Sequence, residues 1–138
     1  KNDIFVGKRI DNPKKFWQMP QGGVEKDESF VKAAKRELLE ETGVKSVKIL
    51  KELDGWFEYS LPNHLLGKIW KGKYRGQKQK WFVMRFLGEN SEINIKNKKP
   101  EFLDWKWIHL TDLTKVVVNF KLDLYQKIEK ELKLLNLN

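Results

Sequence analysis

The 138-residue sequence contains no cysteine and no long apolar run. Without cysteine there is no disulfide, which fits a reducing compartment, so we expect a cytoplasmic protein. The longest apolar runs, such as Trp81–Met84, fall far short of the roughly 20 residues that span a bilayer, so no membrane partner is expected. No secretion leader is visible. Phosphate-binding loops, dinucleotide fingerprints and zinc patterns are also missing, which excludes those cofactor classes.

Positive charge is abundant by comparison. The chain has 28 Lys and Arg against 19 Asp and Glu, which gives a net charge of +9. Such a balance favours polyanionic partners, of which phosphates and nucleic acids are the usual ones. The composition is 40% hydrophobic and 34% charged, as in a folded globular protein. The length suits one domain over residues 1–138, which we expect to be a monomer.

Apolar stretches with strand-like composition occur at residues 3–10, 47–61, 78–87 and 105–110. Two helices are predicted, at about 29–42 and about 120–135, from apolar residues at helical spacing. Strands that bracket and precede helices indicate a mixed α/β domain.

Both ends of the first helix carry strong signals. Ser29 can cap its first turn, and Gly43 can end it in the left-handed conformation. Between them Phe30, Ala34 and Leu38 recur every four residues, which predicts a buried stripe. The position of this helix is therefore well defined by the sequence.

Three carboxylates crowd the end of this helix. Glu37, Glu40 and Glu41 share one face, where like charges cost roughly 0.2–0.5 kcal/mol per pair. Arg36 can pair with one carboxylate, such as Glu28, but one arginine cannot neutralise all the others. A divalent cation can do so, and hard oxygen ligands suit Mg²⁺ or Mn²⁺. The alternative is a solvated acidic face without a ligand.

The full spacing points to a family. Gly22, Glu28 and then Arg36-Glu37-Leu38-x-Glu40-Glu41-x-Gly43-Val44 match the Nudix box at every defined position. The chain resembles a Nudix hydrolase. The resemblance implies an α/β/α sandwich around a mixed sheet, with the box as a loop–helix–loop. It also implies Mg²⁺-dependent hydrolysis of a nucleoside diphosphate linked to another group.

Further segments resemble the bacterial RNA pyrophosphohydrolase branch of that family, which includes asymmetric diadenosine tetraphosphate hydrolases. These segments are WQMPQGG (17–23), GWFEYSLP (55–62), GQKQKWF (76–82), PEF (100–102), W-x-W (105–107) and VVxFKxDxY (117–125). This branch normally has a strand upstream of residues 3–10, so we expect that strand to be truncated or missing here.

The resemblance also assigns site residues. It implies that Glu28 and Arg36 support the helix, and that Glu37 or Glu101 acts as a base. The implied metal ligands are Glu37, Glu40, Glu41 and Glu101. The implied substrate contacts are Arg9, Tyr59, Lys78, Val118, Phe120 and Lys121, with Arg9 and Lys121 at phosphates and the aromatic and apolar residues at a base.

Simpler explanations exist for several of these residues. Glu101 can be an ordinary exposed glutamate, and Val118 and Phe120 can be core residues. The stretch from Lys68 to Arg85, which includes Lys78, has seven Lys or Arg and no acid. It can hold RNA electrostatically or be a solvated basic loop.

The expected function is Mg²⁺-dependent removal of pyrophosphate from the 5′-triphosphate end of RNA, or cleavage of dinucleoside polyphosphates. Two alternatives remain. One is an ADP-ribose or nucleotide-sugar pyrophosphatase, and the other is a catalytically silent binder of nucleotides or RNA. The intact carboxylates of the box argue against the silent binder.

Overall fold

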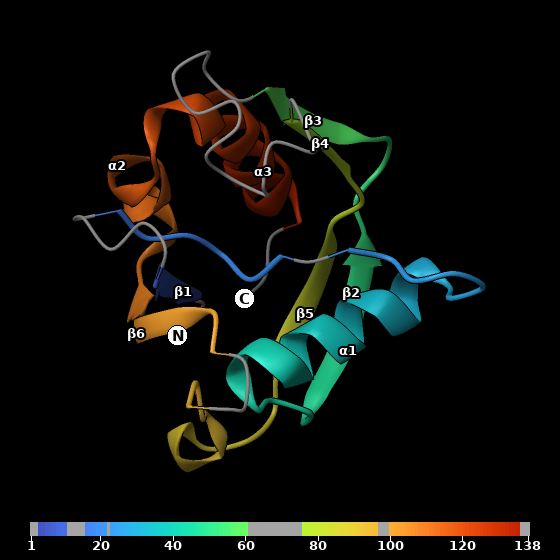
Figure 1. Cartoon of the computed structure of the whole chain (residues 1–138). Coiled ribbons are helices and arrows are strands. Elements are labelled where there is room, and N and C mark those ends of the chain that lie inside the picture. Colours follow the sequence, from blue (N-terminus) through green and yellow to red (C-terminus); the bar gives the residue numbers. More distant parts are fainter. Residues whose placement is uncertain (1–2, 11–15, 22, 61–75, 97–99, 136–138) are drawn as a thin grey trace.

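The computed structural model describes residues 3–10, 16–21, 23–60, 76–96 and 100–135, except for the side chains of 76–78 (Figure 1). Its strands are β1 (Ile4–Arg9), β2 (Val47–Glu52), β3 (Phe57–Ser60), β4 (Gly76–Gln79), β5 (Phe82–Phe86) and β6 (Phe102–Ile108). Its α-helices are α1 (Phe30–Thr42), α2 (Leu113–Val116) and α3 (Leu122–Leu134). Single 3₁₀ turns lie at Asn90–Glu92, Leu110–Asp112 and Asn119–Lys121. None of the helices in these ranges is long and apolar enough to cross a membrane.

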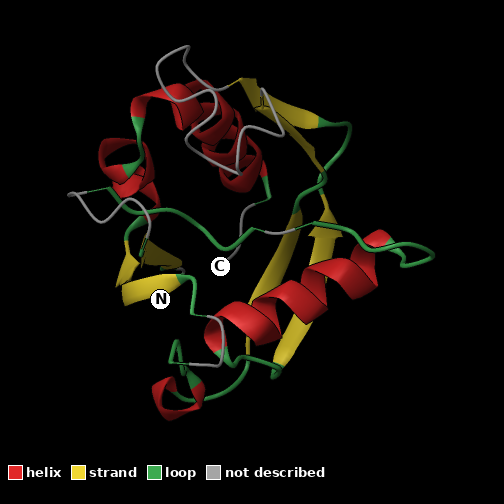
Figure 2. Cartoon of the chain, viewed as in Figure 1, coloured by secondary structure: helices red, strands yellow, loops and turns green. Residues whose placement is uncertain are grey.

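These elements confirm the predicted α/β class and refine its boundaries (Figure 2). The stretch 47–61 forms two strands instead of one, since a bend at Asp54 and Gly55 separates β2 from β3. Gly55 has φ 75°, a conformation that glycine adopts without steric cost. The helix expected at about 120–135 begins with a 3₁₀ turn and becomes α-helical at Leu122.

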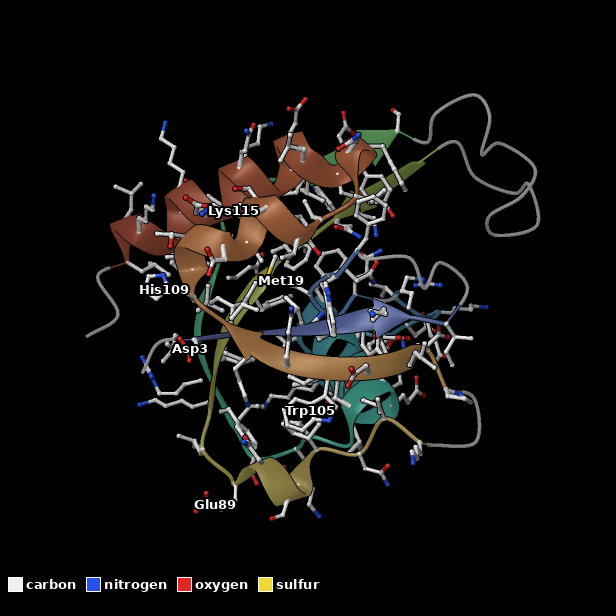
Figure 3. All side chains as sticks on the ribbon, turned by 90° about the vertical axis from the view of Figure 1, so that its left-hand side faces the viewer. Asp3, Met19, Glu89, Trp105, His109 and Lys115 are labelled. Atoms are coloured by element: carbon white, nitrogen blue, oxygen red, sulfur yellow. The ribbon has the colours of Figure 1, made fainter. Side chains whose placement is uncertain are left out.

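The strands pair as three separate two-stranded antiparallel sheets: β1 with β6, β2 with β5, and β3 with β4. Within the described residues they do not form the single mixed sheet that the resemblance implies. A cleft of about 910 Å³ borders both the β1–β6 pair and the β2–β5 pair. In Figures 1 and 3, α1 and α3 lie on opposite sides of the strands.

The apolar core gathers under α3. Leu124, Tyr125 and Ile128 of this helix are at most 2% exposed and belong to one buried cluster with Val6 and Leu53. The Tyr125 hydroxyl accepts a hydrogen bond of 2.7 Å from the backbone N–H of Met19. This contact ties the segment before the acidic helix to the core.

Helix α1 has the predicted ends but not the predicted buried stripe. The Ser29 Oγ accepts from the Lys32 N–H at 3.2 Å, and Gly43 has φ 73°. Phe30, however, is 40% exposed, and the buried residues of the helix are Ala33, Glu41 and Thr42. The predicted stripe is wrong because its side of the helix lines the cleft, where Phe30 packs edge to face against Trp56 but stays 40% exposed.

Candidate active site

Arg36 is the centre of the acidic cluster. It pairs with Glu28 in a bidentate manner, with Nε to Oε2 at 2.7 Å and Nη2 to Oε1 at 3.0 Å. Its Nη2 also donates to the carbonyl oxygen of Gly23 at 2.7 Å. Nη1 donates to Glu37 Oε1 at 2.6 Å and to Glu40 Oε2 at 3.0 Å. The expected pair with Glu28 is present, and the guanidinium also reaches two of the three clustered carboxylates.

The pKa values of Glu28, Arg36 and Glu37 are all shifted from their ordinary values. The hydrogen bond from Arg36 holds the pKa of Glu28 below its ordinary value, helped by the backbone N–H of Glu25. The same bond to Glu28 raises the pKa of Arg36. Burial raises the pKa of Glu37, and this outweighs the opposing hydrogen bond from Arg36. Arg36 thus anchors the loop before α1 to the helix through Glu28.

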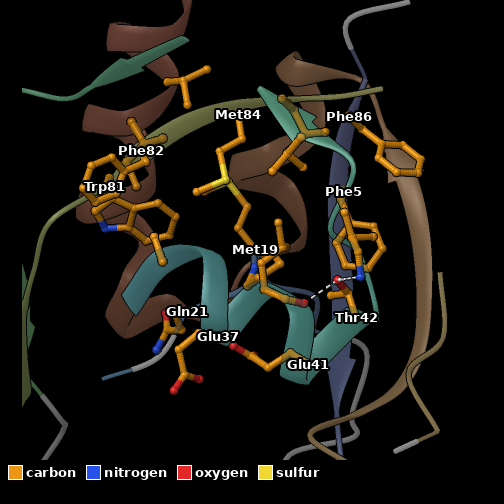
Figure 4. A pocket seen from close by; sticks show the side chains of 18 of the residues that line it. Phe5, Met19, Gln21, Glu37, Glu41, Thr42, Trp81, Phe82, Met84 and Phe86 are labelled. Carbon is orange, nitrogen blue, oxygen red and sulfur yellow. Dashed lines mark hydrogen bonds between the residues drawn. The ribbon is translucent and has the colours of Figure 1, made fainter. Parts of the chain in front are cut away.

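Glu41 is the most unusual carboxylate of the cluster. It is only 2% exposed, and its Oε2 has no hydrogen-bond partner among the described residues. Burial raises the pKa of Glu41 to about 9, with repulsion from Glu37 and Glu101 adding to the effect and Arg9 opposing it. Figure 4 shows Glu37 and Glu41 on α1, lining the cleft together with Gln21.

Glu101 and Arg9 complete the charged group. Arg9 Nη2 lies 3.6 Å from Glu101 Oε2, and their side chains are 21% and 47% exposed. The carboxylate of Glu101 is close enough to raise the pKa of both Glu37 and Glu41. The structure therefore brings together Arg9 of β1, the carboxylates of α1 and Glu101, which immediately precedes β6.

A second group surrounds Lys121, which is only 4% exposed. Its Nζ donates to the side-chain oxygens of Gln18 at 3.0 Å and of Gln21 at 3.4 Å. It also lies 5.1 Å from the ring centroid of Tyr59 and 6.0 Å from that of Phe120. The rings of Tyr59 and Phe120 pack edge to face at 5.7 Å. A cation and two aromatic rings therefore meet at one place.

Gln21 connects the two groups. Its Nε2 donates to the Tyr59 hydroxyl at 3.3 Å, while its side chain lines the same cleft as Glu37 and Glu41 (Figure 4). Burial raises the pKa of the Tyr59 hydroxyl to about 12, so it is neutral and can accept this bond. The carboxylates of α1 thus lie on one side of Gln21, and Lys121 with the rings of Tyr59 and Phe120 lies on the other.

Val118 and Lys78 are less closely tied to the site. Val118 is half-buried, and it lines a small depression that Arg9 also borders. Lys78 lies on β4 opposite Glu58, but its side chain is outside the described residues. Most of the basic stretch from Lys68 to Arg85 is likewise outside them, so its proposed contact with RNA stays a prediction.

Comparison with known proteins bears on this arrangement. The model of the NUDIX domain matches residues 1–128. The chain belongs to the Nudix family. Two curated relatives named RNA pyrophosphohydrolase are similar to this Nudix chain. The one from Pelagibacter ubique (strain HTCC1062) is 60% identical over 132 residues, which cover 96% of this chain and 84% of the relative. The one from Rickettsia canadensis (strain McKiel) is 48% identical over 130 residues, covering 94% and 81%.

Solved structures agree on the fold. The E. coli dihydroneopterin triphosphate pyrophosphohydrolase matches with a TM-score of 0.68 at 22% identity, over 93% of this chain and 84% of that one. At this level of identity the match supports the Nudix fold of the chain and leaves its substrate open. The α/β fold predicted from the Nudix box is therefore confirmed.

Nudix hydrolases generally require a divalent metal ion, and the residues here fit one. A buried carboxylate oxygen without a partner, on Glu41, beside a second carboxylate of raised pKa, on Glu37, is a hard-oxygen donor set that positive charge would stabilise. In the described residues no three acidic or histidine side chains already converge as a metal site. Glu37 and Glu40 are turned towards Arg36, so a cation would have to draw them away from it.

Gln18 and Gln21 were not predicted from the sequence as side-chain participants. Gln18 is 6% exposed, and its Nε2 has no hydrogen-bond partner among the described residues. Both glutamines belong to the WQMPQGG segment (17–23), and this segment was the feature of the sequence that could have pointed to them. Their partner Lys121 is 103 positions from Gln18 in sequence, so local pattern could not reveal the contact.

Proposed function

We propose that this Nudix protein removes pyrophosphate from the 5′-triphosphate end of RNA in a reaction that depends on Mg²⁺. The observation that carries the proposal is the meeting of two groups at Gln21, the carboxylates of α1 on one side and the Lys121–Tyr59–Phe120 group on the other. The two relatives named RNA pyrophosphohydrolase support the same substrate for this chain.

The carboxylates supply the chemistry of hydrolysis in this proposal. Glu40 and Glu41 hold the metal ion, Glu37 and Glu101 act as ligand or as base, and Glu28 and Arg36 position the helix. A bound divalent ion shields phosphate charge and lowers the pKa of the attacking water. All the candidate ligands are carboxylate oxygens, which suit Mg²⁺ and also Mn²⁺. A base near this cluster accepts the proton that the water loses as it attacks phosphorus.

The Lys121 group supplies recognition. Two amide oxygens, which carry no formal charge, accept hydrogen bonds from the Lys121 ammonium. We assign this cation, together with Arg9, to the 5′ phosphates. Tyr59, Phe120 and Val118 are assigned to a base near the RNA end, since an aromatic face can stack on any base. Because this group is separate from the carboxylates, an RNA of two or more nucleotides should be a better substrate than a free nucleoside triphosphate.

Dinucleoside polyphosphate cleavage is a second activity of the same site. Its substrate also carries a base and a polyphosphate chain, so the same two groups would bind it. ADP-ribose or nucleotide-sugar hydrolysis is the alternative within the family. It needs no contact to a second nucleotide, and so gives no role to the Lys121 group as a whole.

A substrate panel tests the proposal. Triphosphorylated RNA, diadenosine tetraphosphate, ADP-ribose and 8-oxo-dGTP are compared at one salt and Mg²⁺ concentration, and kcat/KM is measured for each. Triphosphorylated RNA should give the highest value. Glu41→Gln should reduce it by orders of magnitude, while Glu89→Gln, the same change at an exposed carboxylate outside the site, should leave it unchanged. Faster turnover of ADP-ribose would replace the RNA assignment with the nucleotide-sugar one.

A further inference from the structure

The side chain of Gln18 is a buried amide of which only one half is used. It is 6% exposed, and its Oε1 accepts a hydrogen bond of 3.0 Å from the Lys121 ammonium. Its Nε2 is buried as well, and it has no hydrogen-bond partner within the described part of the chain. A buried N–H group without a partner is costly, and most such groups in native proteins are paired. Gln18 therefore holds a donor whose acceptor has to be identified.

The backbone that carries this amide is held firmly. The Gly7 N–H donates to the Gln18 carbonyl oxygen at 2.7 Å, and the Gln18 N–H donates to the Gly7 carbonyl oxygen at 2.9 Å. The N–H of the preceding residue, Trp17, donates to the Val116 carbonyl oxygen at 2.8 Å. A backbone bonded in this way leaves the amide little freedom beyond its own rotamers. The donor is therefore preorganised, as a group that binds a ligand needs to be.

Two cations that the proposed function assigns to phosphates lie close to Gln18. Lys121 is its hydrogen-bond partner, and Arg9 lines with it a depression of about 10 Å³ that Trp17 and Val118 also border. A cavity of roughly 10–15 Å³ admits one oxygen-sized atom and is too small for a nucleobase. Beside two cations, an anionic oxygen is the acceptor that gains most, since hydrogen bonds to a charged acceptor are stronger than neutral ones.

We propose that Gln18 binds the polyphosphate chain of the substrate, with Nε2 donating to a phosphate oxygen while Oε1 holds the Lys121 ammonium. The inference rests on the proposed function, because it takes the phosphates of that substrate as the ligand. An amide can accept and donate at once, whereas an ionised carboxylate can only accept. Because the amide is also uncharged, it orients the Lys121 ammonium without cancelling its charge.

A bound water molecule is the other partner that fits the depression. A water that stays in place would satisfy the donor with or without substrate, so the Gln18 amide would not respond to a phosphate chain. A phosphate oxygen would instead replace the water when substrate binds, because its negative charge is favoured beside Arg9 and Lys121. The response of the Gln18 amide to ligands with and without phosphates therefore distinguishes the two partners.

NMR of the wild-type protein observes this donor directly and needs no catalysis. Glutamine side chains are labelled with ¹⁵N, and the Gln18 amide is assigned as the resonance that is missing from Gln18→Glu. In EDTA, a 5′-triphosphorylated RNA dinucleotide and inorganic tripolyphosphate should each move a Gln18 amide proton downfield, while the same dinucleotide with a 5′-hydroxyl should not. An unmoved resonance at saturating triphosphorylated dinucleotide, or an equal shift with the 5′-hydroxyl form, would overturn the proposal.

Binding by variants gives a second readout. The Kd values of the 5′-hydroxyl and 5′-triphosphorylated dinucleotides are measured in EDTA, and their ratio reports what the phosphates contribute. The ratio should fall about tenfold to a hundredfold in Gln18→Met, which loses the donor, and further in Gln18→Glu, whose carboxylate repels phosphate and pairs with Lys121. Gln126→Glu, the same change at an exposed glutamine of α3, should keep the wild-type ratio.

The possible outcomes separate this inference from the function on which it rests. A purely structural role of Gln18 would weaken the binding of both dinucleotides alike, and the ratio would stay as in wild type. A high ratio in wild type that both Gln18 variants keep would therefore overturn the inference alone. A wild-type ratio near one would contradict the proposed recognition of 5′ phosphates, and this inference with it.

Discussion

Replacing Glu41 with glutamine should remove most of the pH dependence of stability in the metal-free protein. Glu41 is 2% exposed and its pKa is raised to about 9. An unfolded chain releases this proton near the ordinary value of 4.5. Between these two values the folded state holds a proton that the unfolded state does not. The contribution of Glu41 to stability is therefore fully present below pH 4.5 and is lost as the pH rises towards 9.

The size of this loss follows from linkage. One pKa unit corresponds to about 1.4 kcal/mol, so raising the pH from about 5 to about 7.5 should lower the free energy of unfolding by about 3 kcal/mol through Glu41 alone. The pKa of Glu37 is also raised, so Glu37 adds a change in the same direction. Comparing wild type with Glu41→Gln isolates the part that belongs to Glu41, because glutamine does not titrate.

Urea denaturation in EDTA at several pH values measures this effect. Wild type should lose stability across the interval, and Glu41→Gln should lose much less. Glu40→Gln is the matched control, since Glu40 is 57% exposed and its removal leaves Glu41 in place, so it should keep the wild-type slope. Added Mg²⁺ should restore the wild type at the higher pH. A flat wild-type profile, or the same slope in Glu41→Gln, would refute the reasoning.

Three further predictions concern other parts of the molecule. Glu28→Gln should lower the urea midpoint of unfolding, because the bidentate bond to Arg36 loses its charge; an unchanged urea midpoint would mean that the loop is held in another way. Gly43→Ala should cost about 1–2 kcal/mol in thermal or urea unfolding, because φ is 73° and a Cβ would lie 3.2 Å from the backbone of Asn94; a stability equal to wild type would contradict the strain. Phe120→Ala should lower kcat/KM for triphosphorylated RNA about tenfold to a hundredfold while sparing a nucleoside triphosphate, with Phe120→Leu as a control for packing volume; equal loss on both substrates would assign Phe120 to the core alone.

The helix of the Nudix box could be predicted almost residue by residue because its signals are local. Ser29 and Gly43 act within one turn of the helix ends, and the structure has them in the expected conformations. The burial of its stripe could not be predicted from the helix alone. Whether Phe30 is covered depends on what lies opposite, which is a property of distant strands.

The same distinction applies to the site. The spacing of Glu37, Glu40 and Glu41 indicates one helix face. It does not show that Glu37 and Glu40 accept hydrogen bonds from Arg36 and are oriented towards it. That outcome depends on side-chain conformations and on the Gly23 carbonyl, which fixes the guanidinium from the other side. The contacts of Lys121 with Gln18 and Gln21 join segments about 100 positions apart, which no local pattern reports.

The most direct test of the proposed function is identification of the products made from a short 5′-triphosphorylated RNA. The protein is incubated with this RNA and Mg²⁺, and both the RNA and the released phosphate species are identified by mass spectrometry and chromatography. The account predicts RNA with a 5′-monophosphate and free pyrophosphate from wild type and from Glu89→Gln, and almost no product from Glu41→Gln. An intact 5′-triphosphate with wild type, or equal product with Glu41→Gln, would contradict it.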